Sequence, residues 1–386
     1  MNFQLTEEQE MLRAMAREFA DGEIAPIAAK MDEEGCIPDD LRKKLRDQNF
    51  FALLIPEEYG GAGIDQVAYA VILEELSRAS AAVAITVSVH NSVGAAPIQL
   101  FGTEAQKRKW LPLLAREQLG AFALTEPGSG SDAAALIARA ERQGDDYILN
   151  GSKTFITNGQ YADLFLVMAR TSPDHKHRGI TAFLIEKDRP GLHVGKLIQK
   201  MGLLASDTTE LNMENCRVPV ENRLGDEGHG FKVAMQALDG GRIGVAAQAL
   251  GIAQASLDAA ARYARERLQF GRPIAEYQAI QWMIADMATE IEAARLLMLR
   301  AAWLKDAGLP CSPQASMAKL LASRMARVSA DYAVQIHGGY GYTKEFAVER
   351  YYRDAKVTEL YEGTSEIQRI VIAGSILHPK ERKKAL

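Results

Sequence analysis

The sequence predicts an α+β fold built from three regions in the order helical, β and helical. Apolar residues recur at helical spacing through the first third, short β-branched and aromatic runs follow Gly120, and long Ala-rich segments return from about Gly230. A chain of 386 residues can bury a large core that such regions share. We therefore expect an N-terminal helical domain (1–120), a middle β-barrel or sandwich domain (121–229) and a C-terminal four-helix bundle domain (230–386).

The first region carries several helix-start signals. Thr6 and Gln9 have the spacing of a capping box, in which each side chain bonds the backbone of the other residue. Pro26 is expected to bend or end the first helix, because proline has no backbone N–H. Asp65 can cap a later helix. We expect helices over about 6–29, 39–49, 65–78, 79–98 and 104–116.

The other two regions are defined by turns and breaks. Asn150-Gly151 lies between two apolar runs, and this dipeptide predicts a type I′ hairpin between strands at 147–149 and 152–156. Glycine and proline at 271–273 and 308–310 separate three long helices. Further strands are expected at 164–169, 180–185 and 209–213. Bundle helices are expected at about 230–266, 277–306 and 313–337, with a fourth from 345–356 or after Ser365.

The composition excludes several classes of protein. The net charge is −5 with acidic and basic residues interspersed, so nothing indicates a nucleic-acid partner. The apolar run 79–98 contains polar residues and Pro97, which favours a buried helix over a membrane span. Three widely spaced cysteines fit a reducing compartment with buried thiols, and no metal site is predicted. The N-terminal residues lack signal-peptide and transit-peptide features, so we expect a cytoplasmic protein.

The segment 361–368 has the clearest chemical signal. Glu362 directly precedes Gly363, and Ser365 and Gln368 have capping-box spacing, so a helix is expected to begin there. Glu362 would stand on a loop that glycine allows to turn sharply, as a general base requires. Carboxylates are also favoured near helix N-termini for electrostatic reasons alone, so this acid could be purely structural.

Two loops in the middle region could contact a ligand. The small residues of 122–132 leave backbone N–H groups unobstructed for a phosphate or a flavin edge, and Thr125, Ser129 and Ser131 add hydroxyl groups. A surface turn would have a similar composition. Residues 153–159 are expected to be a strand that ends in a turn, with Phe155 in the core.

Three stretches in the last region allow an ordinary structural interpretation. Residues 267–278 and 335–342 are expected to be helix ends stopped by glycine, where cations are favourable. His337 would then be a capping or solvated histidine. Asp239 is expected to be a helix N-cap and Arg242 a surface residue.

Together, these stretches resemble the acyl-CoA dehydrogenase family in the expected order, over essentially the whole chain. The matching motifs are Thr-Glu-Pro-Gly-Ser-Gly-Ser-Asp at 125–132, Lys-Thr-Phe-Ile-Thr-Asn-Gly at 153–159, 267–278, 335–339 and 361–368. The resemblance implies an FAD enzyme in which Glu362 removes the α-proton of an acyl-CoA while flavin N5 accepts the β-hydride, giving a trans-2-enoyl-CoA. Burial of Glu362 without a cation partner would raise its pKa toward the range useful for this step.

The resemblance also implies a set of binding residues. Those for FAD within one subunit are Phe122, Ala123, Leu124, Thr125, Gly130, Ser131, Phe155, Ile156, Thr157, Thr364, Ser365 and Glu366. Those that reach the FAD of a neighbouring subunit are Arg267, Phe270, Gln278, Gln335, Ile336, His337, Gly338 and Gly339. Those for the acyl-CoA substrate are Ser131, Asp239, Arg242 and Gly363. Many relatives carry tryptophan where Phe155 stands, so the aromatic face is kept and an N–H is lost.

Partners and substrate follow from the same resemblance. It implies an electron-transferring flavoprotein as the electron acceptor and a homo-oligomer, expected to be a homotetramer, whose subunits share FAD sites. Residues 239–244 look most like the short-chain, butyryl-type members, and short branched-chain or medium-chain substrates remain open. Some relatives place their catalytic glutamate where Gly241 stands here. An acyl-CoA oxidase and a non-catalytic scaffold on the same fold are the alternatives.

Overall fold

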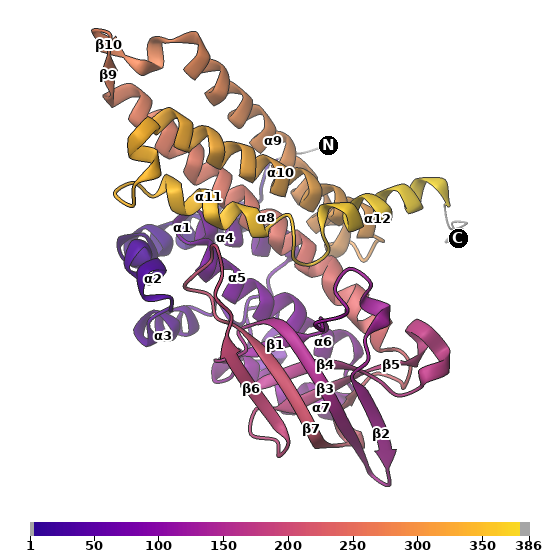
Figure 1. Cartoon of the computed structure of the whole chain (residues 1–386). Coiled ribbons are helices and arrows are strands. Elements are labelled where there is room, and N and C mark those ends of the chain that lie inside the picture. Colours follow the sequence, from indigo (N-terminus) through magenta and orange to yellow (C-terminus); the bar gives the residue numbers. More distant parts are fainter. Residues whose placement is uncertain (1–3, 379–386) are drawn as a thin grey trace.

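The computed structural model describes residues 4–378, and its elements follow the predicted order of helices, strands and helices. In Figure 1 the long C-terminal helices occupy the top of the view and the sheet occupies the bottom. The N-terminal helices, in indigo and purple, lie against both. The α+β fold class is therefore confirmed, while the boundaries at 120 and 229 remain a prediction.

The N-terminal helices begin where their caps predict. Thr6 N donates to Gln9 Oε1 at 3.0 Å and Gln9 N donates to Thr6 Oγ1 at 3.2 Å, which completes the capping box. Asp65 accepts from Ala68 N at 2.6 Å. A π turn and a 3-10 turn containing Pro26 separate the first two helices. The helices are α1 Glu7–Phe19, α2 Ala28–Glu34, α3 Asp39–Asp47, α4 Gln66–Ala79, α5 Ala81–Val89, α6 Ala96–Phe101 and α7 Glu104–Arg116.

The apolar stretch Ala81–Phe101 is a core helix, as predicted. It is long and apolar enough to cross a membrane, yet the protein buries its most apolar window completely. A π-helical segment, His90–Ala95 (η4), joins α5 to α6 within it. The polar side chains inside are hydrogen-bonded to the backbone: His90 Nδ1 accepts from Gly120 N at 2.9 Å, and Asn91 donates to the Phe50 carbonyl at 2.9 Å.

The β region forms one sheet around its own apolar core. Within residues 4–378 this sheet has eight strands in the order β6-β7-β3-β2-β4-β5-β8, with β1 parallel to β4. Phe165 and Val167 of β4 face the inner core, and Leu166 and Met168 face the helices α6 and α7. The strands are β1 Gly120–Ala123, β2 Arg139–Gln143, β3 Asp146–Thr157, β4 Leu164–Arg170, β5 Ile180–Glu186, β6 Leu192–Leu197, β7 Thr208–Pro219 and β8 Arg223–Leu224.

The hairpin prediction at Asn150-Gly151 is wrong. Both residues lie inside the continuous strand β3, at a register shift against β7. Gly151 has φ 142°, and a β carbon there would lie 2.6 Å from the β carbon of Ala138. The glycine therefore serves a bulge and a close backbone approach rather than a turn. The hairpin that the structure does form pairs β2 with β3, and its turn lies between Gln143 and Asp146.

The C-terminal helices pack as a bundle around α8, whose buried residues are mostly alanine and glycine. A two-stranded tip, β9 Leu268–Gln269 with β10 Arg272–Pro273, separates α8 from α9 at the end of the bundle (Figure 1). Gly308, with φ 65°, separates α9 from α10. The helices are α8 Gly230–Glu266, α9 Gln278–Asp306, α10 Ser312–His337, α11 Val348–Val357 and α12 Ser365–Leu377.

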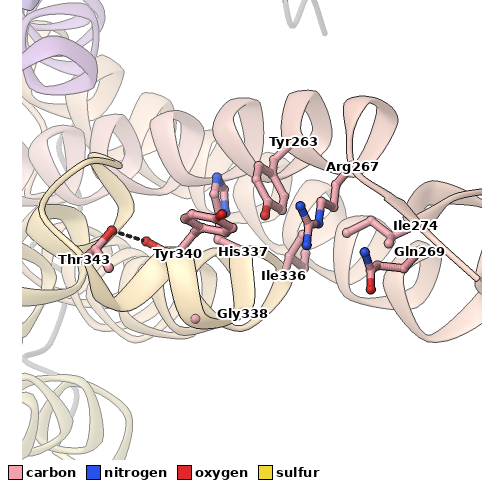
Figure 2. A pocket seen from close by; sticks show the side chains of 10 residues that line it. Tyr263, Arg267, Gln269, Ile274, Ile336, His337, Gly338, Tyr340 and Thr343 are labelled. Carbon is pink, nitrogen blue, oxygen red and sulfur yellow. Dashed lines mark hydrogen bonds between the residues drawn. The ribbon is translucent and has the colours of Figure 1, made fainter.

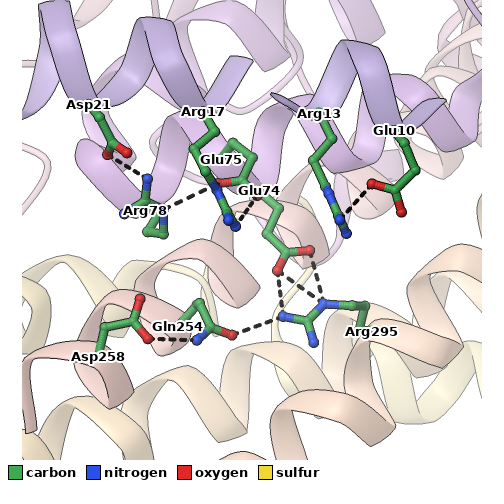
Figure 3. A network of polar contacts seen from close by, with 10 residues as sticks. All are labelled: Glu10, Arg13, Arg17, Asp21, Glu74, Glu75, Arg78, Gln254, Asp258 and Arg295. Atoms are coloured by element: carbon green, nitrogen blue, oxygen red, sulfur yellow. Dashed lines mark hydrogen bonds and ion pairs between the residues drawn. The ribbon is translucent and has the colours of Figure 1, made fainter. Parts of the chain in front are cut away.

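A polar network joins the first helix to the bundle (Figure 3). Glu74 and Glu75 lie side by side on α4 and are both buried. Glu75 accepts two bonds from Arg17 of α1, at 2.7 and 3.0 Å. Glu74 accepts from Arg295 of α9, with the shortest contact at 2.6 Å. Each buried acid thus has a guanidinium partner, so the network locks α1, α4 and α9 together.

Candidate active site

Glu362 stands on a tight turn between α11 and α12. Its backbone φ is 53° and that of Gly363 is 95°, so two consecutive residues are left-handed. This conformation costs roughly 1–3 kcal/mol for a residue with a β carbon. The helix begins at Ser365 as predicted, but its cap is Thr364, whose hydroxyl accepts from Ile367 N at 3.4 Å. The capping-box assignment to Ser365 is therefore wrong by one residue.

Two buried side chains hold the carbonyl groups of this turn. Gln368 Nε2 donates to the Gly363 carbonyl at 2.8 Å and to the Glu362 carbonyl at 3.2 Å. Lys319 of α10 donates its ammonium group to the same Gly363 carbonyl at 2.8 Å. Gln368 thus reaches back to carbonyl oxygens, whereas a capping box would use the N-cap N–H.

The carboxyl group of Glu362 points onto the surface of α8. A β carbon at Gly241 would lie 2.7 Å from the Glu362 carboxyl carbon, so glycine alone leaves room for the acid. Oε2 is enclosed and has no hydrogen-bond partner among the described residues. Burial raises the pKa of Glu362 to about 7, against the opposing charges of Arg242, Lys319 and Lys305.

Asp239 and Arg242 lie beside this carboxyl group, inside helix α8. Their predicted roles as an N-cap and a surface residue are wrong, because α8 begins at Gly230 and Arg242 is buried. Arg242 donates to Asp239 at 2.8 Å, and Ser312 of α10 donates to the same oxygen at 2.9 Å. Arg242 Nε is enclosed without a partner among residues 4–378. A donor therefore remains available for a ligand next to Glu362.

The two predicted loops of the β region pack on one another through a buried ion pair. Lys153 donates to Glu126 at 2.7 Å and to the Leu124 carbonyl at 3.1 Å. Glu126 also accepts from Ile137 N and Ala138 N, at 2.7 and 3.0 Å. Burial lowers the pKa of Lys153 to about 8, with the charge of Glu126 opposing this change. These bonds fix the backbone around Thr125.

Phe155 presents its ring outward from this scaffold. Its side chain is 64% exposed and its φ is 58°, so the expectation that it belongs to the core is wrong. Thr154 N donates to the Thr125 carbonyl at 2.9 Å, which places the predicted contact residues of both loops side by side. Thr157 is partly exposed on the same strand. An aromatic ring held outward in a strained conformation fits a flat ligand such as the flavin ring.

The small loop 122–132 is partly self-contained. Ser129 is buried and donates its hydroxyl group to the Asp132 carbonyl at 2.6 Å. The prediction that this hydroxyl group serves a ligand is therefore wrong. Gly128, Gly130 and Ser131 are exposed, and a β carbon added to either glycine would meet no atom within 4 Å. The loop therefore offers open backbone rather than three hydroxyl groups.

A second group of predicted residues lines a cavity of about 460 Å³ at the tip of the bundle (Figure 2). The guanidinium group of Arg267 lies 5.6 Å from the ring centre of Tyr340. His337 is buried, its ring centre lies 4.2 Å from that of Tyr263, and its Nδ1 bonds the Ala333 carbonyl at 2.7 Å in the last turn of α10, so it is not solvated. Predicted residues that line this cavity are Arg267, Ile336, His337, Gly338 and Gly339.

The remaining predicted residues of this group do not line the cavity. Phe270 is 95% exposed at the end of the tip, and Gln278 and Gln335 are exposed nearby. In Figure 1 the tip lies at the far end of the bundle from the sheet that carries Phe155. One chain therefore does not bring the two groups of predicted FAD residues together.

The sequence interpretation missed Lys319 and the pair Glu126–Lys153. A signal for Lys319 was present, because Ala315, Ala318 and Ala322 surround it on the apolar side of an Ala-rich segment. A lysine on a buried face requires an acceptor. Lys153 gave a similar signal, because it lies in a segment expected to be a strand of the β region, where a buried ammonium group would need an acceptor.

Comparisons with known proteins cover nearly the whole chain. The family models "Acyl-CoA dehydrogenase, N-terminal domain", "middle domain" and "C-terminal domain" match residues 6–118, 121–216 and 228–377. The short-chain specific acyl-CoA dehydrogenase of Clostridium acetobutylicum is 50% identical over 97% of this chain and 100% of that protein.

Two solved structures have the same fold. Butyryl-CoA dehydrogenase from Megasphaera elsdenii has a TM-score of 0.96 at 46% identity, over 98% of this chain and 100% of that one. A chain in a structure described as the electron transferring flavoprotein of Acidaminococcus fermentans has a TM-score of 0.96 at 50% identity, with the same coverage.

Proposed function

The chain belongs to the acyl-CoA dehydrogenase family, and from this premise we propose that it oxidises a short-chain acyl-CoA to the trans-2-enoyl-CoA, with Glu362 as the general base. Enzymes of this family are flavoprotein oxidoreductases that bind FAD. One observation carries the assignment of the base. Oε2 of Glu362 is enclosed without a hydrogen-bond partner among residues 4–378, and burial raises the pKa of this acid to about 7. A base with such a pKa is matched to proton transfer at neutral pH.

The residues around the β loops and the bundle tip fit FAD. Phe155 offers an exposed ring and Thr157 a hydroxyl group to the flavin, and the Arg267 guanidinium suits a diphosphate. When bound there, FAD supplies the oxidant that takes up the β-hydrogen and its electron pair. Because the two groups of residues lie far apart in one chain, we propose that neighbouring subunits complete each site, as a homotetramer would allow.

The residues of this chain would perform the remaining tasks. Glu362 would remove the α-proton, which requires its ionised form. The negative charge that develops on the thioester oxygen needs a donor, and the Glu362 N–H has no acceptor among the described residues. Arg242 Nε has no hydrogen-bond partner among the described residues, and we propose that Arg242 and Asp239 contact the pantetheine part of the substrate.

Support for a short acyl chain comes from the wall beside Glu362. The Tyr361 hydroxyl donates to Gln248 Oε1, and Gln248 Nε2 donates to the Ala81 carbonyl at 2.8 Å. Ser77 donates to the Gln248 carbonyl at 2.6 Å. These bonds tie α4, α5, α8 and the Glu362 turn together, so Tyr361 and Gln248 are held in place and resist moving aside for a longer chain. Relatives named as short-chain and butyryl-CoA enzymes agree with this proposal.

The electron acceptor is proposed to be an electron-transferring flavoprotein, since one related chain occurs in a structure described by that name. An acyl-CoA oxidase would instead pass the electrons to oxygen. Measuring peroxide formed per turnover, with and without the acceptor protein, separates the two. Peroxide produced at the full turnover rate would overturn the dehydrogenase assignment.

The base is tested with Glu362→Gln. We expect this variant to retain FAD and bind acyl-CoA but to lose flavin bleaching by substrate under anaerobic conditions. Glu8→Gln is the matched control, because that acid is exposed on α1, away from the predicted site residues, and should leave bleaching intact. Normal bleaching in Glu362→Gln would contradict the assignment.

The substrate class is tested by adding butyryl-CoA, isobutyryl-CoA and octanoyl-CoA separately to the yellow wild-type protein without oxygen. We expect butyryl-CoA to bleach the flavin fastest. Gln248→Ala removes part of the proposed wall and should shift the preference toward octanoyl-CoA. An unchanged preference in this variant would reject Gln248 as part of the chain-length limit.

A further inference from the structure

Lys319 is a buried cation that the proposed reaction does not use. Its side chain is fully buried in the middle of α10, among alanine residues. An ammonium group has three donors, and burying one without strong partners is costly. The one hydrogen bond recorded for it within residues 4–378 runs to the Gly363 carbonyl, at 2.8 Å. A cation is thus kept inside the protein at the turn that carries Glu362.

This turn needs support because its backbone is strained. Glu362 has φ 53° although it carries a β carbon, and Gly363 follows with φ 95°. Such strain persists only where surrounding contacts outweigh it. Lys319 and Gln368 both donate to the Gly363 carbonyl at 2.8 Å, and they approach from two different helices. The two side chains form a clamp, which we define as Lys319 and Gln368 on the Gly363 carbonyl.

Three cations act on the pKa of Glu362, in the order Arg242, Lys319 and Lys305. The titratable groups that face Glu362 come from α4, α8, α9, α10 and its own turn, and they are Tyr69, Asp239, Arg242, Lys305, Lys319 and Tyr361. Arg242 is already paired with Asp239, and Lys305 is partly exposed. Among the acids that raise the pKa of Lys319, Glu362 has the largest effect, ahead of Glu359 and Glu366.

We propose that Lys319 is a positioning residue, which holds the Glu362–Gly363 turn in its left-handed form and favours the ionised form of the Glu362 carboxyl group. The proposal rests on the function proposed above, because it assigns Lys319 a role only through Glu362. The hydrogen bond to the Gly363 carbonyl holds the turn in place, and the positive charge favours ionisation of the Glu362 carboxyl group. The two contributions can be separated by substitution.

Lys319→Met keeps the volume of the side chain and removes both the charge and the donor. We expect the pH at which the rate of flavin reduction reaches half its maximum to rise by about one pH unit, because an opposite charge near the carboxylate is lost. The maximum rate should fall about 100-fold, since a misplaced base reacts poorly. Amide hydrogen exchange in residues 359–368 should become faster, and KM should change little.

Three further variants assign these effects. Gln368→Leu removes one clamp donor without changing charge, so it should speed exchange in the turn and leave the pH midpoint in place. Lys319→Arg keeps the charge and should return the midpoint toward that of the wild type. Arg324→Met is the matched control on α10, because Arg324 is ion-paired to Glu290 at 3.6 Å on the outside of the helix. This control should change neither the rate of flavin reduction, nor its pH midpoint, nor the amide exchange of residues 359–368.

A lysine with a merely structural role would give a different result. Lys319→Met would then lower the melting temperature while the pH midpoint and the exchange of residues 359–368 stayed as in the wild type, and this would overturn the proposal. If the Met variant does not fold, Lys319→Gln removes the charge and is judged by the same midpoint. Failure of the wild type itself to be bleached by any acyl-CoA would overturn the proposed function rather than the role of Lys319.

Discussion

The carboxyl group of Glu362 occupies the space above Gly241 that a side chain at that position would fill. Its carboxyl carbon lies 2.7 Å from the place of a β carbon on Gly241. The two residues are 121 positions apart and come from α8 and the turn before α12. A glutamate at 241, where some family members are expected to carry their base, would reach the same space. The Glu362 carboxyl group can keep this place only while position 241 has no side chain.

Gly241→Ala should reduce activity without unfolding the protein. The new methyl group would push the flexible carboxyl group away from its position, and a displaced base slows proton transfer by about 100-fold. Stability should change little, because alanine favours a helix interior over glycine by about 1 kcal/mol and offsets the crowding. Flavin reduction by butyryl-CoA measures the rate. Gly22→Ala is the control. A β carbon at position 22 would meet no neighbouring group of the described residues within 4 Å, so this variant should react as the wild type does.

The rate of flavin reduction should depend on pH through Glu362. Burial raises the pKa of this acid to about 7, and a general base must be ionised, so the rate should increase as the pH rises through about 7 and then level off. Stopped-flow reduction between pH 5.5 and about 9 checks this. A rate that stays constant from pH 5.5 upward would show that the carboxyl group keeps its ordinary pKa.

Glu362→Gln should make the protein more stable at pH 8 and leave its stability unchanged at pH 4. The folded-state pKa is raised above the unfolded value, so the wild type binds its proton more tightly when folded and loses stability as the pH rises from about 4.5 to about 7. Each pH unit between the two values corresponds to about 1.4 kcal/mol, so the gain in unfolding free energy is at most roughly 3 kcal/mol. Urea unfolding of both proteins at the two pH values measures it. Equal stability at pH 8 would contradict the buried, raised-pKa acid.

Substitutions of Phe155 should separate cofactor binding from folding. Its ring is 64% exposed, so Phe155→Ala should weaken FAD binding by about tenfold while the apoprotein keeps its stability. Phe155→Gly should bind FAD equally weakly but stabilise the apoprotein by about 1 kcal/mol, since glycine accepts φ 58° without strain. Phe155→Trp is the control that keeps the aromatic face. FAD titration and thermal unfolding of the apoprotein are the measurements, and unchanged FAD affinity in both small variants would reject the stacking role.

Lys153→Met should destabilise the β region strongly. It leaves the Glu126 carboxylate buried without its cation, and breaking such a pair from one side costs about 3–5 kcal/mol. The double variant Glu126→Gln with Lys153→Met removes both charges and should recover much of this loss. Urea unfolding of the three proteins gives the free energies. A single variant as stable as the wild type would mean that the ion pair is not needed.

Local sequence signals were sufficient where neighbouring residues alone set the structure. The capping box at Thr6, the Asp65 cap and the periodic helices of the bundle were predicted correctly, because their hydrogen bonds join residues three or four positions apart. The same reasoning was wrong at Asn150-Gly151, where a distant strand approaches the glycine and produces a bulge. The cap expected at Asp239 was wrong, because α8 begins nine residues earlier, at Gly230, where the bundle helix itself was predicted to begin.

Three features of this protein could be predicted from residue order: the succession of helices and strands, the family resemblance and Glu362 as the candidate base. These conclusions depend on periodicity and on contiguous motifs, which the order of residues contains. Three others became visible only in the folded protein: the Glu362 carboxyl group lies over Gly241, Phe155 points outward, and Lys319 donates a hydrogen bond to the Gly363 carbonyl. The physical reason is that burial and charge at a site come from residues far apart in the chain, and their effects on a pKa or a strained turn exist only once the helices have packed.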